Sequence, residues 1–291
     1  YTYDSLNTYR FNDFQRLDTN LSIKYPFIEF DKNNYSFHSK SSPNFELFYS
    51  KFIEISNNKK GKLNFYHIGG SHIQADIYTH DARSFLQSNW SNTPGERGWV
   101  FPFDLAKTNN PGNYEFSSPN KWRGFSSVSQ RTKRSGMDFG VLGEMITCED
   151  SAIIIYFKHD YTKVKPPFNH IRIFHNKGEL PYDIHFGRDE FLVTKITRDE
   201  DLGCTDIYFT DPLDNFDVQF SRKEYHAPEL EIYGFVLMND DPGISYSSIG
   251  INGAGLYTYL ANTRFEEQLT AYPPDFFAFS VGTNDGNVPN D

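Results

Sequence analysis

Three strand-length runs in this sequence each end at a glycine that begins a turn. The runs span residues 63–68, 244–249 and 276–281, and the glycines are Gly69, Gly250 and Gly282. A helical pattern separates the second run from the third, so these two strands should be parallel and joined by a right-handed crossover. Open parallel sheets place their chemistry where the strands end. The pattern therefore predicts an α/β fold with polar groups gathered at one rim of a parallel sheet.

Helical patterns flank these strands. Apolar residues between Ile73 and Leu86 predict a helix that follows the first glycine turn and ends near Trp90. A second apolar stripe over residues 256–269 predicts a helix that ends before the two prolines at 273–274. Residues 45–53 form a further amphipathic stretch, which also has helix-like spacing.

The middle of the sequence has a different pattern. Short β-rich runs there alternate with clusters of Gly, Pro and Asp. The runs are residues 152–157, 170–174, 191–196, 206–209, 217–220 and 229–237. Several short strands with frequent turns are typical of a β-sandwich. We therefore expect an α/β domain in two parts, residues 1–113 and 242–291, interrupted by an inserted all-β sandwich at residues 114–241.

Charge and run length exclude several classes of function. The formal net charge of −10 argues against a nucleic-acid backbone, and equally against an anionic membrane, as the partner. The longest apolar runs, such as residues 153–157, are far shorter than a bilayer crossing, so we do not expect the chain to span a membrane. A neutral glycan or a small ester fits better. Cys148 and Cys204 either pair or remain buried thiols, and the sequence leaves both alternatives open.

Ser71, Gly253 and Asn284 are the candidates for chemistry at the predicted rim. Ser71 follows two glycines that permit a sharp turn, and a predicted helix begins directly after it and supplies free N–H groups. Gly253 offers a bare backbone N–H, and Asn284 offers a side-chain amide. Acyl transfer requires a nucleophile and donors aimed at a developing oxyanion. A Gly-Gly-Ser turn by itself is more often a plain connection, and only the constellation favours catalysis.

These turns resemble the sequence blocks of the SGNH (GDSL-type) hydrolases. Gly69-Gly70-Ser71-His72-Ile73-Gln74-Ala75-Asp76 is similar to the first block, in the bacterial variant Gly-Asp-Ser-His-x-Gln. Gly250-Ile251-Asn252-Gly253-Ala254 resembles the second block and Gly282-Thr283-Asn284-Asp285 the third. The stretches 95–98, 101–103 and 107–109 look like a segment common in periplasmic members. Some of these are peptidoglycan O-acetylesterases with a carbohydrate-binding-module-like β-sandwich between the first and second blocks.

The resemblance implies a fold and a set of roles. The fold would be a three-layer α/β/α sandwich with a flavodoxin-like parallel sheet, interrupted by the all-β sandwich. Ser71 would be the nucleophile, and Gly253 and Asn284 would donate to the oxyanion together with the Ser71 N–H. Candidate supports of the cleft are His72, Arg97 and Asp285. The resemblance implies no cofactor and no metal, a periplasmic or extracellular location, and an acetylated polysaccharide or peptidoglycan as substrate.

The sequence departs from the family pattern in two places. Gly70 stands where the family usually has an aspartate that supports the turn by hydrogen bonds. The last block, Asp-x-x-His, supplies the general base and should follow the third block, yet no histidine occurs after His226. We therefore expect this chain to lack its last sheet element, and we expect the block downstream of Asp291. Without that block the protein would be a pseudoenzyme, and an envelope partner or the missing segment would cover the sheet edge.

Other histidines are poor substitutes for this base. His67 lies within a predicted strand, the side chain of His72 should point away from the Ser71 hydroxyl, and His80 is more than two helical turns away. The remaining candidates belong to the expected insert: His159, His170, His175, His185 and His226. His170 and His175 should lie on opposite faces of one strand, so they cannot share a metal.

Aromatic and acidic residues of the insert raise two further possibilities. Seven aromatic side chains are candidates for stacking on sugar rings, although most aromatics of a β-sandwich belong to its core. They are Trp122, Tyr156, Tyr161, Tyr182, Tyr208, Tyr225 and Tyr233. Asp211, Asp240 and Asp241 offer oxygen ligands for calcium, but isolated acid pairs are usually solvated turns.

Three functions remain open at this point. The first is an ester hydrolase acting on O-acetylated glycan, and the second is a polysaccharide O-acetyltransferase with the same fold, in which a sugar hydroxyl replaces water. The third is a non-catalytic glycan-binding or assembly component of the cell envelope. Fold alone does not distinguish an enzyme from a binding protein.

Overall fold

The computed structural model describes residues 22–29, 43–90, 93, 95–129, 136–160 and 165–287. The chain forms two compact units, residues 1–46 and 47–291. In the first unit, residues 22–24 are helical and a turn follows them. In the second unit, three sheets account for the described strands. Every described strand and every part of the candidate site lies in the second unit.

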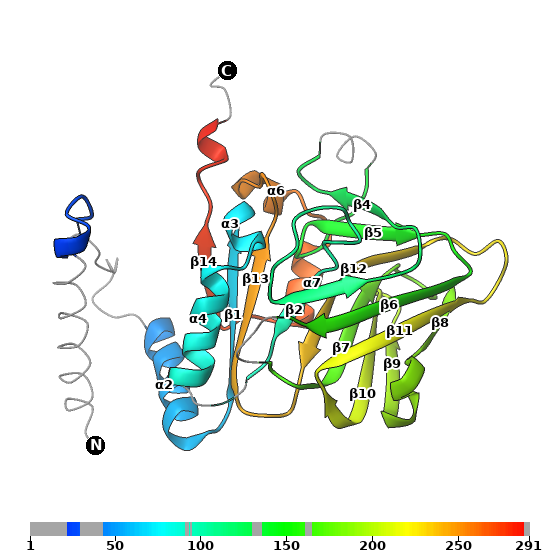
Figure 1. The fold of residues 1–291 in the computed structure, drawn as a ribbon, viewed down its shortest axis with the longest axis horizontal. Coiled ribbons are helices and arrows are strands. Elements are labelled where there is room, and N and C mark those ends of the chain that lie inside the picture. Colours follow the sequence, from blue (N-terminus) through cyan, green and yellow to red (C-terminus); the bar gives the residue numbers. More distant parts are fainter. Residues whose placement is uncertain are drawn as a thin grey trace. The chain divides into compact units, whose positions relative to one another are not determined.

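A three-stranded parallel sheet has the order β13-β1-β14. β1 (Lys62–Gly69) lies in the middle and pairs with β13 (Gly243–Gly250) and β14 (Phe276–Ser280), both in parallel. The register aligns Gly69 with Gly250 and with Ser280, so all three strands end at one edge (Figure 1). The parallel pairing predicted from the three glycine-terminated runs is confirmed.

One face of this sheet is covered by α2 (Pro43–Asn58). Phe48, Phe52 and Ile55 of this helix pack against residues of β1 and β13. The Phe48 ring lies 5.3 Å from that of Phe65 and 4.9 Å from that of Phe276 on β14, so the helix spans the sheet from edge to edge. The helix-like spacing at residues 45–53 is thereby explained by burial against this face.

Two antiparallel sheets form the rest of the unit. The larger has seven strands in the order β4-β5-β12-β7-β10-β9, with β2 beside β12. Its strands are β2 (Gly98–Val100), β4 (Arg123–Ser126), β5 (Glu144–Cys148), β7 (Phe168–His175), β9 (Val193–Asp199), β10 (Cys204–Leu213) and β12 (Leu230–Met238). The smaller has four strands in the order β3-β6-β11-β8. They are β3 (Tyr114–Ser117), β6 (Ala152–His159), β8 (Tyr182–His185) and β11 (Asn215–Arg222).

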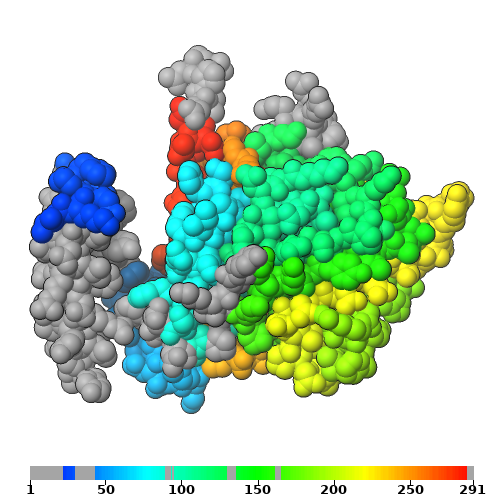
Figure 2. All heavy atoms as spheres, viewed as in Figure 1, coloured from blue at the N-terminus to red at the C-terminus, as the bar shows by residue number. Residues whose placement is uncertain are grey.

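Aromatic side chains join the two antiparallel sheets. Phe116 and Phe216 of the smaller sheet lie 5.2 and 5.8 Å from Phe235 of the larger sheet, measured between ring centres. Residues 114–241 supply every strand of both sheets except β2. In Figure 2 these residues, green to yellow, adjoin the cyan residues of the parallel-sheet region. The six predicted β-rich runs all fall in or across these strands.

The parallel and antiparallel sheets share a core. Tyr66 of β1 is fully buried, and its hydroxyl accepts a hydrogen bond of 2.6 Å from the indole N–H of Trp99 on β2. Tyr66 and Ile68 belong to the same buried cluster as Phe174 and Phe235 of the larger antiparallel sheet. The division of the chain at residues 113 and 241 remains a prediction, because no comparison tests it. One face of the parallel sheet shares its core with the antiparallel sheets, and the other face has a smaller core of its own under α2.

Both long helices predicted at the rim are interrupted. Residues 71–90 form α3 (Ser71–Gln74), α4 (Tyr78–Ser84) and the π-helical η2 (Phe85–Trp90). The break lies at Asp76, which has φ +49° because its buried carboxylate bonds two arginines. Residues 256–271 form α6 (Leu256–Leu260) and α7 (Phe265–Ala271). Arg264, between them, donates to the carbonyls of His175 and Leu202, so tertiary contacts fix this turn.

Two local expectations are settled by the described residues. Cys148 and Cys204 are both buried and free, so the alternative of a disulfide between them is wrong. The run at 191–196 begins in the 3₁₀-helix η3 (Gly187–Leu192), and the strand starts only at Val193. No helix in the described part of the chain is both long and apolar enough to cross a membrane.

Candidate active site

The three glycine turns of the parallel sheet meet at one point. A β-carbon placed on Gly70 would lie 3.0 Å from Nδ2 of Asn284 and 3.6 Å from the carbonyl oxygen of Ala254. Asn284 Nδ2 donates a hydrogen bond of 2.8 Å to that carbonyl. The turn after β1, the turn after β13 and the turn after β14 are therefore in contact, as the sequence predicts from parallel neighbours.

Ser71 and Gly253 are both exposed at this meeting point. Ser71 is the first residue of α3, so its N–H has no carbonyl one turn earlier to bond. Gly253 has φ +81°, a conformation that favours glycine. Within the described part of the chain its N–H donates no hydrogen bond. Asn284 has two amide hydrogens, and the bond to Ala254 uses one of them.

Asp285 fastens the third turn to the second. One of its carboxylate oxygens accepts a hydrogen bond of 2.9 Å from the N–H of Leu256, at the start of α6. A β-carbon on Gly255 would lie 2.4 Å from the same oxygen, so a side chain there would push Asp285 away. Asp285 thus holds the loop that carries Gly253 and Ala254, which is a supporting role. His72, the other expected support, is exposed on α3.

Gln74 connects the first and second turns from inside the protein. Its side chain is buried, accepts a hydrogen bond of 2.7 Å from the Asn252 N–H and donates one of 2.8 Å to the Asn109 carbonyl. Gly250 is tightly packed there, since a β-carbon on it would lie 2.0 Å from the backbone nitrogen of Gln74. Sequence reasoning assigned no role to Gln74. The signal was present, because a glutamine occupies the sixth position of the first block.

Asp76 is the centre of a buried ionic network beneath α3. Its carboxylate accepts hydrogen bonds of 2.9 and 3.0 Å from Arg83 and one of 3.0 Å from Arg97. Asn113 Nδ2 donates a further bond of 2.8 Å, and Ser248 on β13 donates one of 2.5 Å. This network ties α3 and α4 to β13, and sequence reasoning missed it.

Burial and charge act in opposite directions on Asp76. Burial by itself would raise the pKa of the carboxyl, but the Arg83 and Arg97 guanidinium groups hold the pKa well below its ordinary value. Asp76 is therefore ionised and paired. Arg97 is 4% exposed, so it does not line an open cleft. It bonds the carboxylate of Asp76, which follows α3.

The described histidines have different hydrogen-bond and ring-contact partners. His67 on β1 lies 2.7 Å from the Tyr246 hydroxyl and 2.7 Å from the Ser280 hydroxyl, and burial lowers its pKa. The partners of the others are the following: His80 with Arg83, His170 with Asp206, His175 with Thr205 and Asn176, His185 with Glu190, and His226 with Tyr225. His159 is buried beside Phe157. Among these contacts of the described residues, none joins a histidine to Ser71.

The aromatic residues considered for sugar stacking and the acidic residues considered for calcium also have different surroundings. Trp122, Tyr182 and Tyr233 are buried, whereas Tyr156 and Tyr225 are 44% and 88% exposed. Tyr208 is half-buried, and Tyr161 lies outside the described residues. In the described part of the chain, no three His, Cys, Asp or Glu side chains come close enough together to hold a metal ion. Asp240 instead accepts a hydrogen bond from Asn169.

Comparisons with known proteins add one relationship. No protein family and no curated protein matches the sequence. Among solved structures, a peptidoglycan O-acetylesterase has a similar fold, with a TM-score of 0.63 and 18% sequence identity. The match covers 86% of this chain and 64% of that chain, so the present sequence spans less than two thirds of the matched chain. The fold is thus mixed α/β and similar to that of this solved structure.

Proposed function

We propose that this protein is a serine ester hydrolase of the SGNH type, with Ser71 as its nucleophile. The observation that carries the proposal is the contact of three strand-end turns, in which the Asn284 amide lies 3.0 Å from the β-carbon position of Gly70. The turns that meet there carry an exposed serine, an unbonded glycine N–H and a side-chain amide. They supply the nucleophile and the oxyanion donors that acyl transfer requires, apart from the base.

In the proposed reaction the Ser71 hydroxyl attacks the acyl carbon of an ester. The carbonyl oxygen becomes an oxyanion that accepts hydrogen bonds from the N–H groups of Ser71 and Gly253 and from the second amide hydrogen of Asn284. The oxyanion then collapses, the ester C–O bond breaks and the alcohol leaves with the proton taken from Ser71. Water cleaves the resulting acyl-enzyme, which releases the acid and restores the Ser71 hydroxyl. A histidine must take the Ser71 proton, and in the family pattern it belongs to an Asp-x-x-His block. We propose that such an Asp-His dyad completes the site and that the layers of the domain have the family's α/β/α arrangement.

We further propose that the ester is an acetyl group on a polysaccharide, with peptidoglycan as the first candidate, in the periplasm or at the cell surface. One observation supports this class: the solved structure with the similar fold is a peptidoglycan O-acetylesterase. The net charge of −10 disfavours a nucleic acid as the partner.

The test is hydrolysis of acetyl esters by the full-length protein and by Ser71→Ala. We expect acetate release from O-acetylated peptidoglycan and from a small chromogenic acetate, and we expect a loss of at least about 10⁴-fold in kcat when the nucleophile is removed. A matched control is Ser117→Ala, because Ser117 is also an exposed serine but lies on β3.

Equal rates for the wild type and Ser71→Ala would overturn the proposal. Absence of hydrolysis by the full-length protein, with acetyl transfer to an added sugar that depends on Ser71, would assign it as an O-acetyltransferase. Absence of both reactions would assign a non-catalytic role on the same scaffold.

A further inference from the structure

His67 lies between two hydroxyl groups that belong to the neighbouring strands of the parallel sheet. Its Nε2 lies 2.7 Å from the Ser280 hydroxyl on β14, and its Nδ1 lies 2.7 Å from the Tyr246 hydroxyl on β13. The three side chains therefore form a chain of hydrogen bonds across all three strands. A serine bonded to a histidine that a third group orients is the arrangement of an activated nucleophile. The reaction proposed at Ser71 uses none of these residues.

The imidazole of His67 is held in one orientation. Tyr246 is buried, and its ring stacks on that of Phe65 with centres 5.9 Å apart, so its hydroxyl has a fixed position. Tyr78 of α4 contacts the His67 ring edge-on, at 5.7 Å between ring centres. These two contacts keep Nε2 directed at the Ser280 oxygen, which is the positioning that proton transfer requires.

The protonation states also favour transfer from serine to histidine. Burial lowers the pKa of His67, although the charge of Asp76 opposes this shift, so the imidazole is neutral at pH 7. Burial raises the pKa of Tyr246 to about 12, so the phenol is neutral as well and can accept a hydrogen bond from Nδ1–H. That bond leaves the lone pair of Nε2 facing the Ser280 hydroxyl, which is the tautomer of a general base.

Ser280 is open to a substrate. It is exposed, whereas His67 is half-buried. Among the described strands β14 pairs only with β1, and the outer edge of such a strand presents N–H groups that are available to a developing oxyanion. Tyr78 is also exposed and places an aromatic wall beside His67. A small aromatic ester fits these surroundings, because its ring can pack against this tyrosine.

We propose that Ser280 is a second nucleophile, which takes the acyl group of a small aromatic ester, with His67 as its base and Tyr246 as the residue that orients His67. The Ser280 oxygen bonds the carbonyl carbon while its proton passes to Nε2. The ester C–O bond then breaks, and the alcohol leaves with that proton, which returns His67 to its neutral form. The product is an ester of Ser280. This step does not depend on the roles proposed at the three glycine turns.

The experiment uses the whole chain in the Ser71→Ala form, mixed with para-nitrophenyl acetate. We expect a burst of nitrophenolate of about one equivalent per chain, because nitrophenolate leaves far more easily than a serine alkoxide and the acyl-enzyme accumulates. Mass spectrometry of proteolytic peptides should locate the acetyl group on Ser280. The burst occurs once per chain, so it is measured separately from kcat.

Variants in the same background separate the three roles. Ser280→Ala should abolish the burst. His67→Gln should slow it by about 10²-fold or more, since general base catalysis contributes that much. Tyr246→Phe should slow it less and move its pH dependence to lower pH, because the charged imidazole loses the acceptor at Nδ1. A merely structural role of this tyrosine would leave the pH dependence in place.

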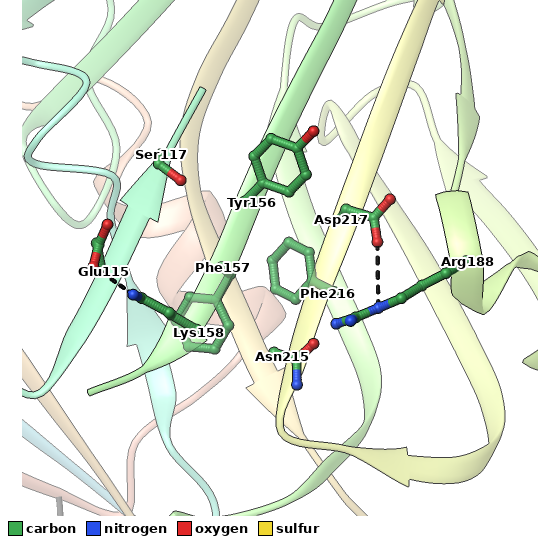
Figure 3. A pocket seen from close by; sticks show the side chains of 9 residues that line it. All are labelled: Glu115, Ser117, Tyr156, Phe157, Lys158, Arg188, Asn215, Phe216 and Asp217. Atoms are coloured by element: carbon green, nitrogen blue, oxygen red, sulfur yellow. Dashed lines mark ion pairs between the residues drawn. The ribbon is translucent and has the colours of Figure 1, made fainter. Parts of the chain in front are cut away.

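The matched control is Ser117→Ala, which should leave the burst unchanged. Ser117 is also an exposed serine, but it lies on the four-stranded sheet in a groove that no described histidine lines (Figure 3). Melting temperatures of all variants show whether each one is folded. Acetylation at residues other than Ser280, absence of a burst, or an unchanged burst rate in His67→Gln would each overturn the inference. Because every sample lacks Ser71, none of these outcomes bears on the function proposed for that residue.

Discussion

At the scale of single residues, Asn284 connects two turns of the candidate site and is also one of its proposed oxyanion donors. One amide hydrogen bonds the Ala254 carbonyl and so fixes the orientation of the other. Gly70 leaves room for this amide, because a β-carbon there would lie 3.0 Å from Nδ2. Position 70 carries a glycine where the resembled family usually has an aspartate. The Asn284 side chain therefore lies close to the space that an aspartate side chain would fill there.

Replacing Asn284 by alanine should lower kcat for acetyl-ester hydrolysis by about 10²- to 10³-fold with little change in KM, because the lost donor acts mainly in the transition state. The control is Asn120→Ala, which loses side-chain hydrogen bonds with Asp150, Ala152 and Ile154 outside the candidate site. Asn284→Ala should cost about 1 kcal/mol of stability, and Asn120→Ala should cost more because it loses more bonds. A fall in kcat of equal size in both variants would contradict the assigned role.

At the scale of secondary-structure elements, Asp76 decides how α3 and α4 sit on the parallel sheet. It bonds Arg83 and Arg97, which are both buried, and through Ser248 it reaches β13. Short helices gain little stability from their own hydrogen bonds, so these contacts hold the Ser71 turn in place.

Replacing Asp76 by alanine should lower the free energy of unfolding by about 3–5 kcal/mol, because two buried arginines lose their counter-charge. The folded-state pKa of Asp76 is below its ordinary value of 3.8, so its contribution is complete above about pH 4 and declines as the pH falls further. Denaturant unfolding across this range measures the difference. Glu179→Ala, which removes an exposed partner of Lys223, is the control and should change stability by about 1 kcal/mol or less. A similar effect of both variants would show that the buried network is unimportant.

The contribution of Glu144, on β5, to stability has the opposite pH dependence to that of Asp76. Burial raises the pKa of this carboxyl to about 8, although a hydrogen bond from Ser126 opposes the shift. A raised folded-state pKa means that the stabilisation is complete below the ordinary value of 4.5 and is lost as the pH rises through about 8. Glu144→Gln should therefore melt progressively higher than the wild type between about pH 5 and 8. If the melting temperatures of the wild type and Glu144→Gln differ by the same amount at every pH in this interval, Glu144 is ionised in the folded protein.

At the scale of the whole molecule, β14 is an edge strand of the parallel sheet, because among the described strands it pairs only with β1. Its residues Phe277 and Phe279 are 37% and 58% exposed, and their rings are stacked with centres 5.6 Å apart. An exposed apolar edge strand is a template for pairing with another chain.

Phe279→Lys should reduce concentration-dependent self-association of the 291-residue chain, as measured by sedimentation velocity. Its stability should stay within about 0.5 kcal/mol of the wild type, because the ring is exposed. Phe191→Lys changes an even more exposed phenylalanine on η3 and is the matched control. Equal association of both variants would mean that β14 is not the contact surface.

The sequence by itself determined the parallel sheet, its three glycine turns and the expected convergence of Ser71, Gly253 and Asn284. These features depend on apolar periodicity, on glycine and on the rule that parallel strands end at one edge, and all of them are local or topological. The resemblance to SGNH hydrolases added the roles, and the similar fold of a peptidoglycan O-acetylesterase supports the architecture.

Only the tertiary structure decided how the site is supported. The Asp76 network, the Gln74 bridge and the broken helices depend on partners more than 20 residues away along the chain, such as Arg97, Asn109 and Asn252. Nothing in the local pattern distinguishes a buried, paired aspartate from a solvated one, because its free energy depends on which charges the fold brings beside it.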